Sequence, residues 1–260
     1  MQTSTEIERI APPSAEVFRR EYLDAARPVI ITGLIDHWPA RTRWSLDYFA
    51  DRFGERRLTS VPLRNGKAAY AKAEVPYETV RFGEYLAALR TAGGADRAVV
   101  FPVELELPEL LDDVARPPYC QDAAWFKTRF WFSPPDTRGA LHRDLPENLY
   151  AQVIGRKEWL IYDRRETARM YSNPPWSGLP HFSRVDAVEP DLARFPRFAG
   201  ARAFHCVLES GDVLFVPSRW WHQARSVDCS VSINFWWADG PLRWVIRAAE
   251  TFAKLRALRP

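Results

Sequence analysis

The sequence predicts a mainly β protein, a sandwich or barrel with helices at both ends. From about Ala98, short β-prone runs follow one another and are separated by Pro, Gly, Asp and Ser. Such spacing is typical of antiparallel sheets, whereas βαβ units would place helical patterns of roughly 10–15 residues between the strands. The expected strands are 99–103, 126–132, 148–153, 159–162, 203–208, 213–216 and 231–237.

Helices are expected before and after this region. Each of the segments 14–27, 45–54 and 79–93 begins at a Ser or Thr suited to an N-cap, and the last two stop at glycine. A β-prone run at 28–32 follows the first helix. After Pro241 an amphipathic helix is expected over 241–260, which either packs on the sheet or forms a homodimer contact. Its apolar stripe consists of Leu242, Val245, Ile246, Ala249, Phe252 and Ala253.

The 260 residues are expected to form a single domain. A composition of 47% hydrophobic and 13% aromatic residues is sufficient for a sizeable core, and no repeat or linker divides the chain. The domain would have an N-terminal helical jacket over about 1–97, a β core over about 98–240 and the C-terminal helix. A loop-rich stretch at 164–200 is long enough to be a lid or binding loop.

Charge and cysteine content exclude several classes of protein. The net charge of +3, from 36 basic and 33 acidic residues, gives no strong nucleic-acid signal. No apolar run is long enough to span a membrane and the start lacks a signal-peptide pattern, so we expect a cytoplasmic protein without membrane contact. Cys120, Cys206 and Cys229 are too few and too widely spaced for a disulfide framework or a thiolate zinc site.

A candidate metal site begins with His142 and Asp144. Because these residues are two apart, an extended segment directs both side chains to one face. The pair alone has a simpler interpretation, a surface histidine beside a solvated acid. His222 changes this balance, since a predicted buried strand, 213–216, delivers it just after two tryptophans. Two histidines and one carboxylate form the facial triad that suits non-haem Fe(II).

Three polar residues on apolar strands strengthen the hypothesis. Lys157 starts a strand that is otherwise apolar, where an ammonium group calls for an anionic partner. Asn148 and Asn234 lie among aromatic and apolar residues, where an unpaired amide is costly. Each has an ordinary structural explanation, a lysine reaching the surface or an amide satisfying a sheet edge, but together they converge on one site.

Several motifs resemble a known family, the JmjC-type, cupin-like 2-oxoglutarate oxygenases. The sequence is most similar to the small hydroxylases typified by factor inhibiting HIF and to the JmjC arginyl hydroxylases. The likeness covers about residues 15–240, and an amino-terminal signature at 28–33 with Trp38-Pro39 matches too. The other motifs are Leu141-His142-Arg143-Asp144, 147–157, 211–217, Trp220-Trp221-His222 and 232–237.

The resemblance implies a double-stranded β-helix that uses Fe(II), 2-oxoglutarate and O2. It assigns His142, Asp144 and His222 to the iron and Lys157 to the far carboxylate of 2-oxoglutarate. Asn148 and Asn234 match positions that line the cosubstrate. The family often has Ser or Thr where this chain has Gly139, which leaves Thr137 as the nearest hydroxyl. An aromatic shell is expected from Trp125, Trp131, Trp159, Trp221 and Trp236.

The resemblance also directs the choice of substrate. The first expectation is a hydroxylase that acts on a side chain of a protein or peptide; an N-methyl-lysine demethylase fits these motifs less well. The alternatives are a hydroxylase of a small metabolite or modified tRNA base, and a cupin-like binding domain without turnover.

Overall fold

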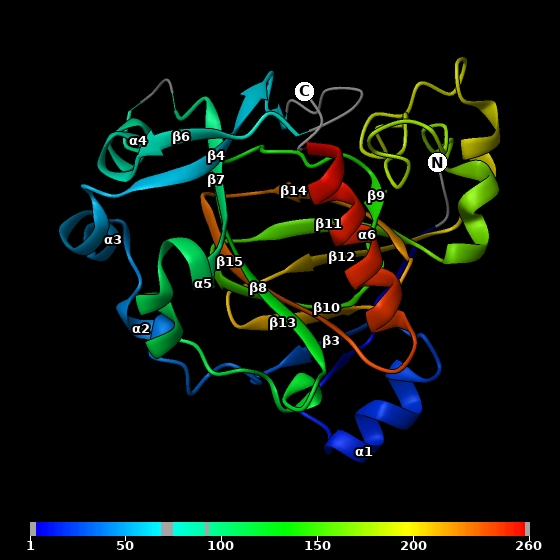
Figure 1. Cartoon of the computed structure of the whole chain (residues 1–260), viewed down its shortest axis with the longest axis horizontal. Coiled ribbons are helices and arrows are strands. Elements are labelled where there is room, and N and C mark those ends of the chain that lie inside the picture. Colours follow the sequence, from blue (N-terminus) through cyan, green and yellow to red (C-terminus); the bar gives the residue numbers. More distant parts are fainter. Residues whose placement is uncertain (1–3, 69–74, 92–93, 258–260) are drawn as a thin grey trace.

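Two largely antiparallel β-sheets form the body of the molecule (Figure 1). The computed structural model describes residues 4–68, 75–91 and 94–257. The smaller sheet has five strands in the order β1(Ser4–Glu6), β12(Ala203–Leu208), β11(Lys157–Tyr162), β14(Trp221–Ser226) and β9(His142–Arg143). β1 lies parallel to β12, and the remaining pairs are antiparallel.

The larger sheet contains ten strands and supplies the opposite wall. Their order is β2(Arg9–Ile10), β3(Val29–Thr32), β13(Asp212–Val216), β10(Glu147–Ile154), β15(Ser230–Ala238), β8(Trp125–Ser133), β7(Arg97–Pro102), β4(Arg57–Arg64) and β5(Lys67–Ala68), with β6(Glu78–Arg81) paired to β4. The sequence-based prediction of a mainly β jelly-roll fold is confirmed, because the chain crosses back and forth between the two sheets: β10 and β13 lie in the larger sheet, and β11 and β12 lie in the smaller one.

Short helices cover the outer face of the larger sheet (Figure 1). They pack through an aromatic cluster in which Phe49 and Phe82 contact Phe132 of β8. This packing buries apolar surface that the strands would otherwise expose to water. The helices are α1(Ala15–Phe18), continued by the turn η1(Arg19–Leu23), α2(Ala40–Arg43), α3(Leu46–Phe53), α4(Phe82–Leu89) and α5(Val103–Glu106).

The N-terminal region differs from the expected helical jacket in one respect. It contributes strands as well as helices, since β3 pairs with β13 and β4 pairs with β7. The predicted caps at Ser14 and Ser45 are confirmed, for both side chains accept a backbone N–H. The cap predicted at Thr79 is wrong: Thr79 pairs with Thr59 inside β6, and α4 starts only at Phe82. A strand pairing formed by distant residues overrode the local cap pattern there.

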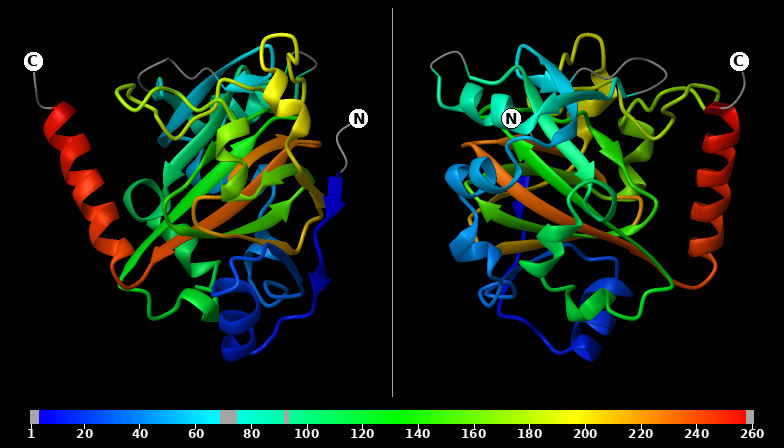
Figure 2. Two further views of the ribbon diagram at one scale, coloured as in Figure 1. Left: turned by 90° about the vertical axis from the view of Figure 1, so that its right-hand side faces the viewer. Right: turned by 60° about the vertical axis from the view of Figure 1, so that its left-hand side comes forward.

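The C-terminal helix α6(Leu242–Ala257) runs beside the body of the molecule (Figure 2). Ile246 is buried against Trp125 and Ala238, whereas Val245, assigned to the same stripe, is half exposed. Residues 258–260 of the expected helix, and the side chains of Ala249, Phe252 and Ala253, lie outside what the structure describes. No helix within the described ranges is both long and apolar enough to cross a membrane.

The space between the sheets and the outside of the smaller sheet are filled separately. Side chains from both sheets, such as Ile30, Trp159 and Leu214, meet in the interior. On the outer side, the loop-rich segment 163–202 packs Met170, Phe195 and Phe198 against Tyr162 and Trp221. It holds the helical turns η4(Arg164–Arg169) and η5(Pro196–Gly200); two others, η2(Pro108–Asp112) and η3(Pro118–Cys120), precede β8. The smaller sheet is therefore covered on both faces, by the interior core between the sheets and by the 163–202 segment on its outer face.

Candidate metal centre

His142, Asp144 and His222 come together on the smaller sheet. The pairing of β9 with β14 places His142 directly opposite His222, and Asp144 follows β9. One ligand atom from each of the three residues can be chosen so that all lie within 4.8 Å of one another. The Asp144 carboxylate is 3.9 Å from His142 Nε2 and 3.6 Å from His222 Nε2. The spacing expected from the sequence is thus realised in three dimensions.

Backbone carbonyl groups fix the orientation of both imidazoles. His142 Nδ1 lies 2.8 Å from the Ala140 carbonyl oxygen, and His222 Nδ1 lies 3.1 Å from that of Trp220. A carbonyl can only accept, so Nδ1 carries the proton in each ring and Nε2 keeps a free lone pair. His142 also stacks on Phe182, with the ring centroids 5.1 Å apart. Both Nε2 atoms are therefore oriented so that they can coordinate a metal ion.

The electrostatics of the three groups favour a bound cation. Burial lowers the pKa of His222 to about 4, with His142 lowering it further and Asp144 opposing the shift, so this ring is neutral at physiological pH. Asp144 Oδ2 is buried and has no hydrogen-bond partner within the described chain. An orphaned carboxylate oxygen beside two imidazole Nε2 atoms is a donor set that fits a divalent transition metal such as Fe(II).

The same three residues line an interior cavity of about 380 Å³ with Lys157. Lys157 Nζ is buried and donates to Tyr150 Oη at 2.8 Å. Burial, the sole cause of the shift, lowers the pKa of Lys157 to about 7, and within the described residues no carboxylate forms an ion pair with it. A buried ammonium group with donors to spare provides a subsite for an anion.

Hydrogen bonds also fix the two asparagines that the sequence singled out. Trp131 Nε1 donates to Asn234 Oδ1 at 2.7 Å, and Asn234 Nδ2 donates to Asn148 Oδ1 at 3.1 Å. This relay determines which way each amide is turned, because an N–H can only donate. Asn148 therefore keeps its Nδ2 donors for the cavity that it lines.

Two aromatic residues with polar atoms have roles that the sequence did not reveal. Tyr150 lies two residues after Asn148 on β10, so both face the cavity. Trp159, also in the cavity wall, keeps a buried Nε1–H without an acceptor among the described residues. The rings of Trp159 and Tyr150 lie in series between His222 and Lys157, at centroid distances of 5.7 and 4.7 Å. The period of two from Asn148 was the signal that could have identified Tyr150.

The predicted hydroxyl at Thr137 reaches the cavity but is already engaged. Thr137 lines the cavity near Gly139, and its Oγ1 donates to the Pro134 carbonyl oxygen at 2.8 Å. Its contact with a cosubstrate stays a prediction.

The expected aromatic shell is correct in part. Trp131, Trp159 and Trp236 line the cavity. The prediction is wrong for Trp221 and Trp125. Trp221 adjoins His222 in a strand, where neighbours face opposite sides, and it packs beneath the 163–202 segment. Trp125, at the start of β8, packs on α6.

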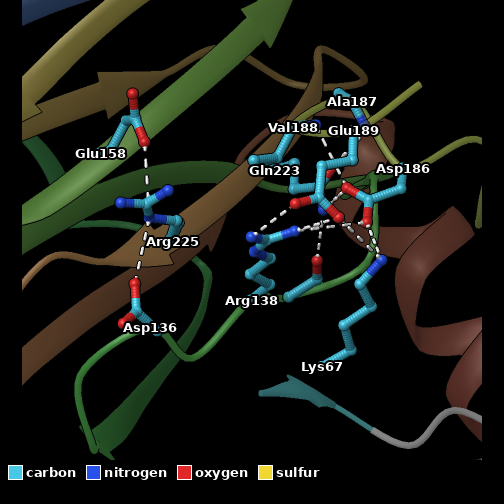
Figure 3. A network of polar contacts seen from close by, with 11 residues as sticks. Lys67, Asp136, Arg138, Glu158, Asp186, Ala187, Val188, Glu189, Gln223 and Arg225 are labelled. Atoms are coloured by element: carbon cyan, nitrogen blue, oxygen red, sulfur yellow. Dashed lines mark hydrogen bonds and ion pairs between the residues drawn. The ribbon is translucent and has the colours of Figure 1, made fainter. Parts of the chain in front are cut away.

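A second cavity, of about 590 Å³, adjoins the first and shares Ala68, Gly139, Leu179 and Phe182 with it. Its wall contains a polar network that ties the 163–202 segment to β14 (Figure 3). Gln223, next to His222, donates to Gly139 O and Asp186 Oδ1 and accepts from Ala187 N. Because Gln223 is buried, this network fixes the segment close to the candidate metal centre.

Ion pairs complete the network from the side of the larger sheet. Lys67 of β5 pairs with Asp186 at 2.6 Å, and Arg138 pairs with Glu189 at 2.8 Å (Figure 3). Both pairs are partly exposed, so each contributes little stability by itself and the geometry of the network is its main effect.

The jelly-roll fold and this donor set are those of a cupin-type protein, with a candidate metal subsite and a candidate anion subsite in one cavity. The chain belongs to the cupin-like domain family, whose model matches residues 14–242. This confirms the resemblance to JmjC-type proteins. JmjC enzymes of this kind use Fe(II), 2-oxoglutarate and O2.

The chain is similar to several named proteins, three of which are described here by their identity and coverage. The chain is 35% identical to Lysine-specific demethylase 8 of Xenopus tropicalis over 92% of this chain and 54% of that protein. It is 25% identical to tRNA wybutosine-synthesizing protein 5 of Homo sapiens, over 90% and 78% of the two chains. It is 26% identical to the bifunctional peptidase and (3S)-lysyl hydroxylase JMJD7 of Homo sapiens, over 87% of this chain and 82% of that protein. The chain spans little more than half the length of the demethylases it matches.

Proposed function

We propose that the protein is an Fe(II)- and 2-oxoglutarate-dependent oxygenase that hydroxylates a C–H bond on a protein or peptide side chain. One observation carries the proposal. One cavity combines the converging ligand atoms of His142, Asp144 and His222 with a buried lysine that forms no ion pair with a carboxylate of the described chain. A metal ion and a dicarboxylate satisfy both requirements at once.

Each residue has a distinct task in this proposal. His142, Asp144 and His222 hold Fe(II), and Lys157 binds the far carboxylate of 2-oxoglutarate. Asn148 offers its amide donors to the cosubstrate, because the relay from Trp131 keeps its oxygen turned away. When bound, iron, 2-oxoglutarate and O2 supply the oxidation: the substrate C–H becomes C–OH, and 2-oxoglutarate becomes succinate and carbon dioxide.

The protein contributes binding, orientation and exclusion of water. The Nδ1 hydrogen bonds keep both imidazoles turned with Nε2 inward before any ligand arrives, which reduces the reorganisation required. Trp131, Trp159 and Trp236 contribute apolar ring surface to the cavity wall. A dry wall strengthens the charge–charge interaction between Lys157 and a carboxylate.

The choice of a protein or peptide substrate is supported by the adjoining cavity. Its 590 Å³ extends the binding surface past Gly139 and Phe182, which suits a chain that continues on either side of the reacting group. The relatives named for tRNA wybutosine synthesis support a modified tRNA base as the alternative substrate, and a small metabolite is the other. A cupin-like binding domain without turnover is the non-enzymatic alternative.

Demethylation of lysine is a second candidate, since relatives 33–36% identical are named lysine-specific demethylases. The lining of the first cavity favours hydroxylation. Asp144, a proposed metal ligand, is the sole acidic residue among its described lining residues, whereas Arg129 and Lys157 are both basic. A cationic methyl-lysine side chain would find no carboxylate left to pair with it.

The experiment that tests this function measures succinate formed from 2-oxoglutarate with Fe(II) and ascorbate, in the wild type and in Asp144→Ala. We expect succinate from the wild type alone. No succinate together with no metal binding would contradict the oxygenase proposal. With peptide pools as substrate, mass spectrometry then separates the candidates: hydroxylation adds one oxygen atom, whereas demethylation removes one methyl group.

Assembly and location are also part of the proposal. Trp244 and Val245 of α6 are both exposed by at least half, which supports a homodimer contact through this helix. Sedimentation velocity of the wild type and of Trp244→Glu tests it; a monomer at all concentrations would contradict it. A cytoplasmic location remains a prediction.

A further inference from the structure

We propose that Tyr150 binds the far carboxylate of 2-oxoglutarate together with Lys157. The Tyr150 hydroxyl would thereby replace the side-chain hydroxyl that Gly139 cannot provide. This inference rests on the proposed function, because it concerns the anion that Lys157 would bind. It also assigns a role to a residue that the sequence motifs leave as ordinary core.

The first step concerns the hydrogen-bonding capacity of Lys157. An ammonium group has three donors, and the described contacts use one of them, the 2.8 Å bond to Tyr150 Oη. The Lys157 side chain also lies over the Tyr150 ring, with Nζ 5.3 Å from the ring centroid. Tyr150 therefore accepts from the lysine and lies close to any anion that the lysine binds.

The second step concerns the proton of the Tyr150 hydroxyl group. Because Tyr150 Oη accepts from Lys157, its own O–H is left to donate elsewhere. Ser232 is a neutral neighbour of this hydroxyl and itself donates to Gln152 Oε1 at 2.8 Å. A carboxylate is a much stronger acceptor than a serine hydroxyl, since charge-assisted hydrogen bonds are about twice as strong as neutral ones. A carboxylate bound at Lys157 would thus accept from both residues.

The third step concerns position 139, where a side-chain hydroxyl is absent. A Cβ atom added to Gly139 would have Ala224 O, at 3.8 Å, as its nearest heavy atom, which is ordinary van der Waals contact. The backbone there carries no positive φ. A serine side chain could therefore be accommodated at position 139. Because Gly139 leaves this part of the cavity wall open, a hydroxyl from another strand, that of Tyr150 on β10, can take its place. Thr137 Oγ1 donates to the Pro134 carbonyl oxygen, so its proton would have to leave that acceptor before it could bind a carboxylate.

The test compares two ligands that differ at the far end alone. Binding of 2-oxoglutarate and of 2-oxopentanoate, which has a methyl group in place of the far carboxylate, is measured by calorimetry with redox-inert Mn(II). The variants are Tyr150→Phe, the double variant Tyr150→Phe with Gly139→Ser, and Tyr162→Phe. Tyr162 is a matched control, since it is also buried, lies outside the described cavity lining and has a hydroxyl without a hydrogen-bond partner among the described residues.

Tyr150→Phe should weaken 2-oxoglutarate roughly 10- to 100-fold, the range for a hydrogen bond to a charged group, and leave 2-oxopentanoate unchanged. Gly139→Ser should restore part of the loss, and Tyr162→Phe should bind both ligands as the wild type does. Unchanged 2-oxoglutarate affinity in Tyr150→Phe, or equal losses for the two ligands, would overturn the role of Tyr150. If the wild type itself binds no 2-oxoglutarate with Mn(II), the proposed function fails and this inference fails with it.

Discussion

On one side of the cavity, acceptor atoms of His142, Asp144 and His222 converge without a donor between them. On the other, Lys157 has donors beyond the one that bonds Tyr150, and Trp159 Nε1–H has no acceptor among the described residues. We call these the metal side and the anion side. Buried acceptors alone call for a cation, and buried donors alone call for an anion. The metal side and the anion side therefore do not satisfy each other's hydrogen-bonding groups. Together they suit a bound cation and a bound anion.

The two sides also differ in how they are held. On the metal side, backbone carbonyl groups orient the imidazoles, so the geometry depends on the pairing of β9 with β14. On the anion side, hydrogen bonds between side chains set the orientation, as in the chain of bonds from Trp131 through Asn234 to Asn148. We expect substitutions to separate the two functions: changes on the metal side should abolish metal binding, and changes on the anion side should weaken the cosubstrate alone.

The largest effect is expected for Asp144→Ala. Removing the only carboxylate of the triad should abolish metal-dependent succinate formation, while the fold persists, because Asp144 Oδ2 forms no stabilising hydrogen bond with the part of the chain that the structure describes. Metal affinity by calorimetry and the thermal midpoint measure the two effects. Asp228→Ala, an exposed acid paired with Arg156, is the control and should retain activity. Full activity in Asp144→Ala would remove this residue from the centre.

Lys157→Met should weaken 2-oxoglutarate by roughly 30-fold or more, the cost of removing one partner of a buried charged pair, and leave metal affinity unchanged. The apo protein should become more stable, because the variant replaces a buried ammonium group with an apolar side chain of similar length. Separate titrations of Mn(II) and 2-oxoglutarate check this. Equal losses for both ligands would indicate misfolding and would refute the separation of the two sides.

The affinity for 2-oxoglutarate should also depend on pH. Burial depresses the pKa of Lys157 to about 7, so the unliganded side chain loses its proton as the pH rises through that value. A carboxylate binds the protonated form, so the affinity should fall above pH 7, approaching tenfold per pH unit at the limit. Calorimetry between pH 6.5 and about 8.5 tests this; 2-oxopentanoate, without the far carboxylate, should show no such fall. A flat profile for 2-oxoglutarate would exclude Lys157 as its partner.

A smaller effect is expected for Trp131→Phe. The loss of one hydrogen bond, worth about 1 kcal/mol, frees the Asn234 and Asn148 amides to turn and should weaken 2-oxoglutarate several-fold. Trp236→Phe is a matched control, because Trp236 also lines the cavity but its Nε1 has no partner in the described chain. Equal effects in both variants would mean that aromatic packing, and not the relay, positions Asn148.

The sequence singled out the three residues of the metal side and Lys157, Asn148 and Asn234 of the anion side, but not the hydrogen bonds that aromatic residues form with them. His142 and Asp144 lie two apart and Lys157 interrupts an apolar strand, so each leaves a local signal. Tyr150 leaves only its spacing of two from Asn148, and Trp131 leaves no sign of its hydrogen bond, because an aromatic residue on a strand is usually core and its polar atom shows a role only when its partner is known. Trp221 was misassigned for the same reason, since its neighbour His222 occupies the interior face.

The fold shows a similar division. The strands from β8 to β15 were predictable except β9 and β14, because apolar runs mark buried strands. The polar composition of β14, Trp221–Ser226, resembles a loop, since it is stabilised by pairing with β11 and β9 and not by its own pattern. β4 and β6 were missed because they extend the sheet at its border, where long-range pairing outweighs local propensity.

The central claim is that one cavity binds a metal ion and 2-oxoglutarate together. The most direct test is the affinity of the wild type for 2-oxoglutarate with and without Mn(II), measured by calorimetry. We expect Mn(II) to tighten binding by about tenfold or more, a typical coupling between linked sites, because the keto acid end would chelate the metal while Lys157 holds the other end. The same affinity with and without Mn(II) would contradict the claim that the two ligands share this cavity.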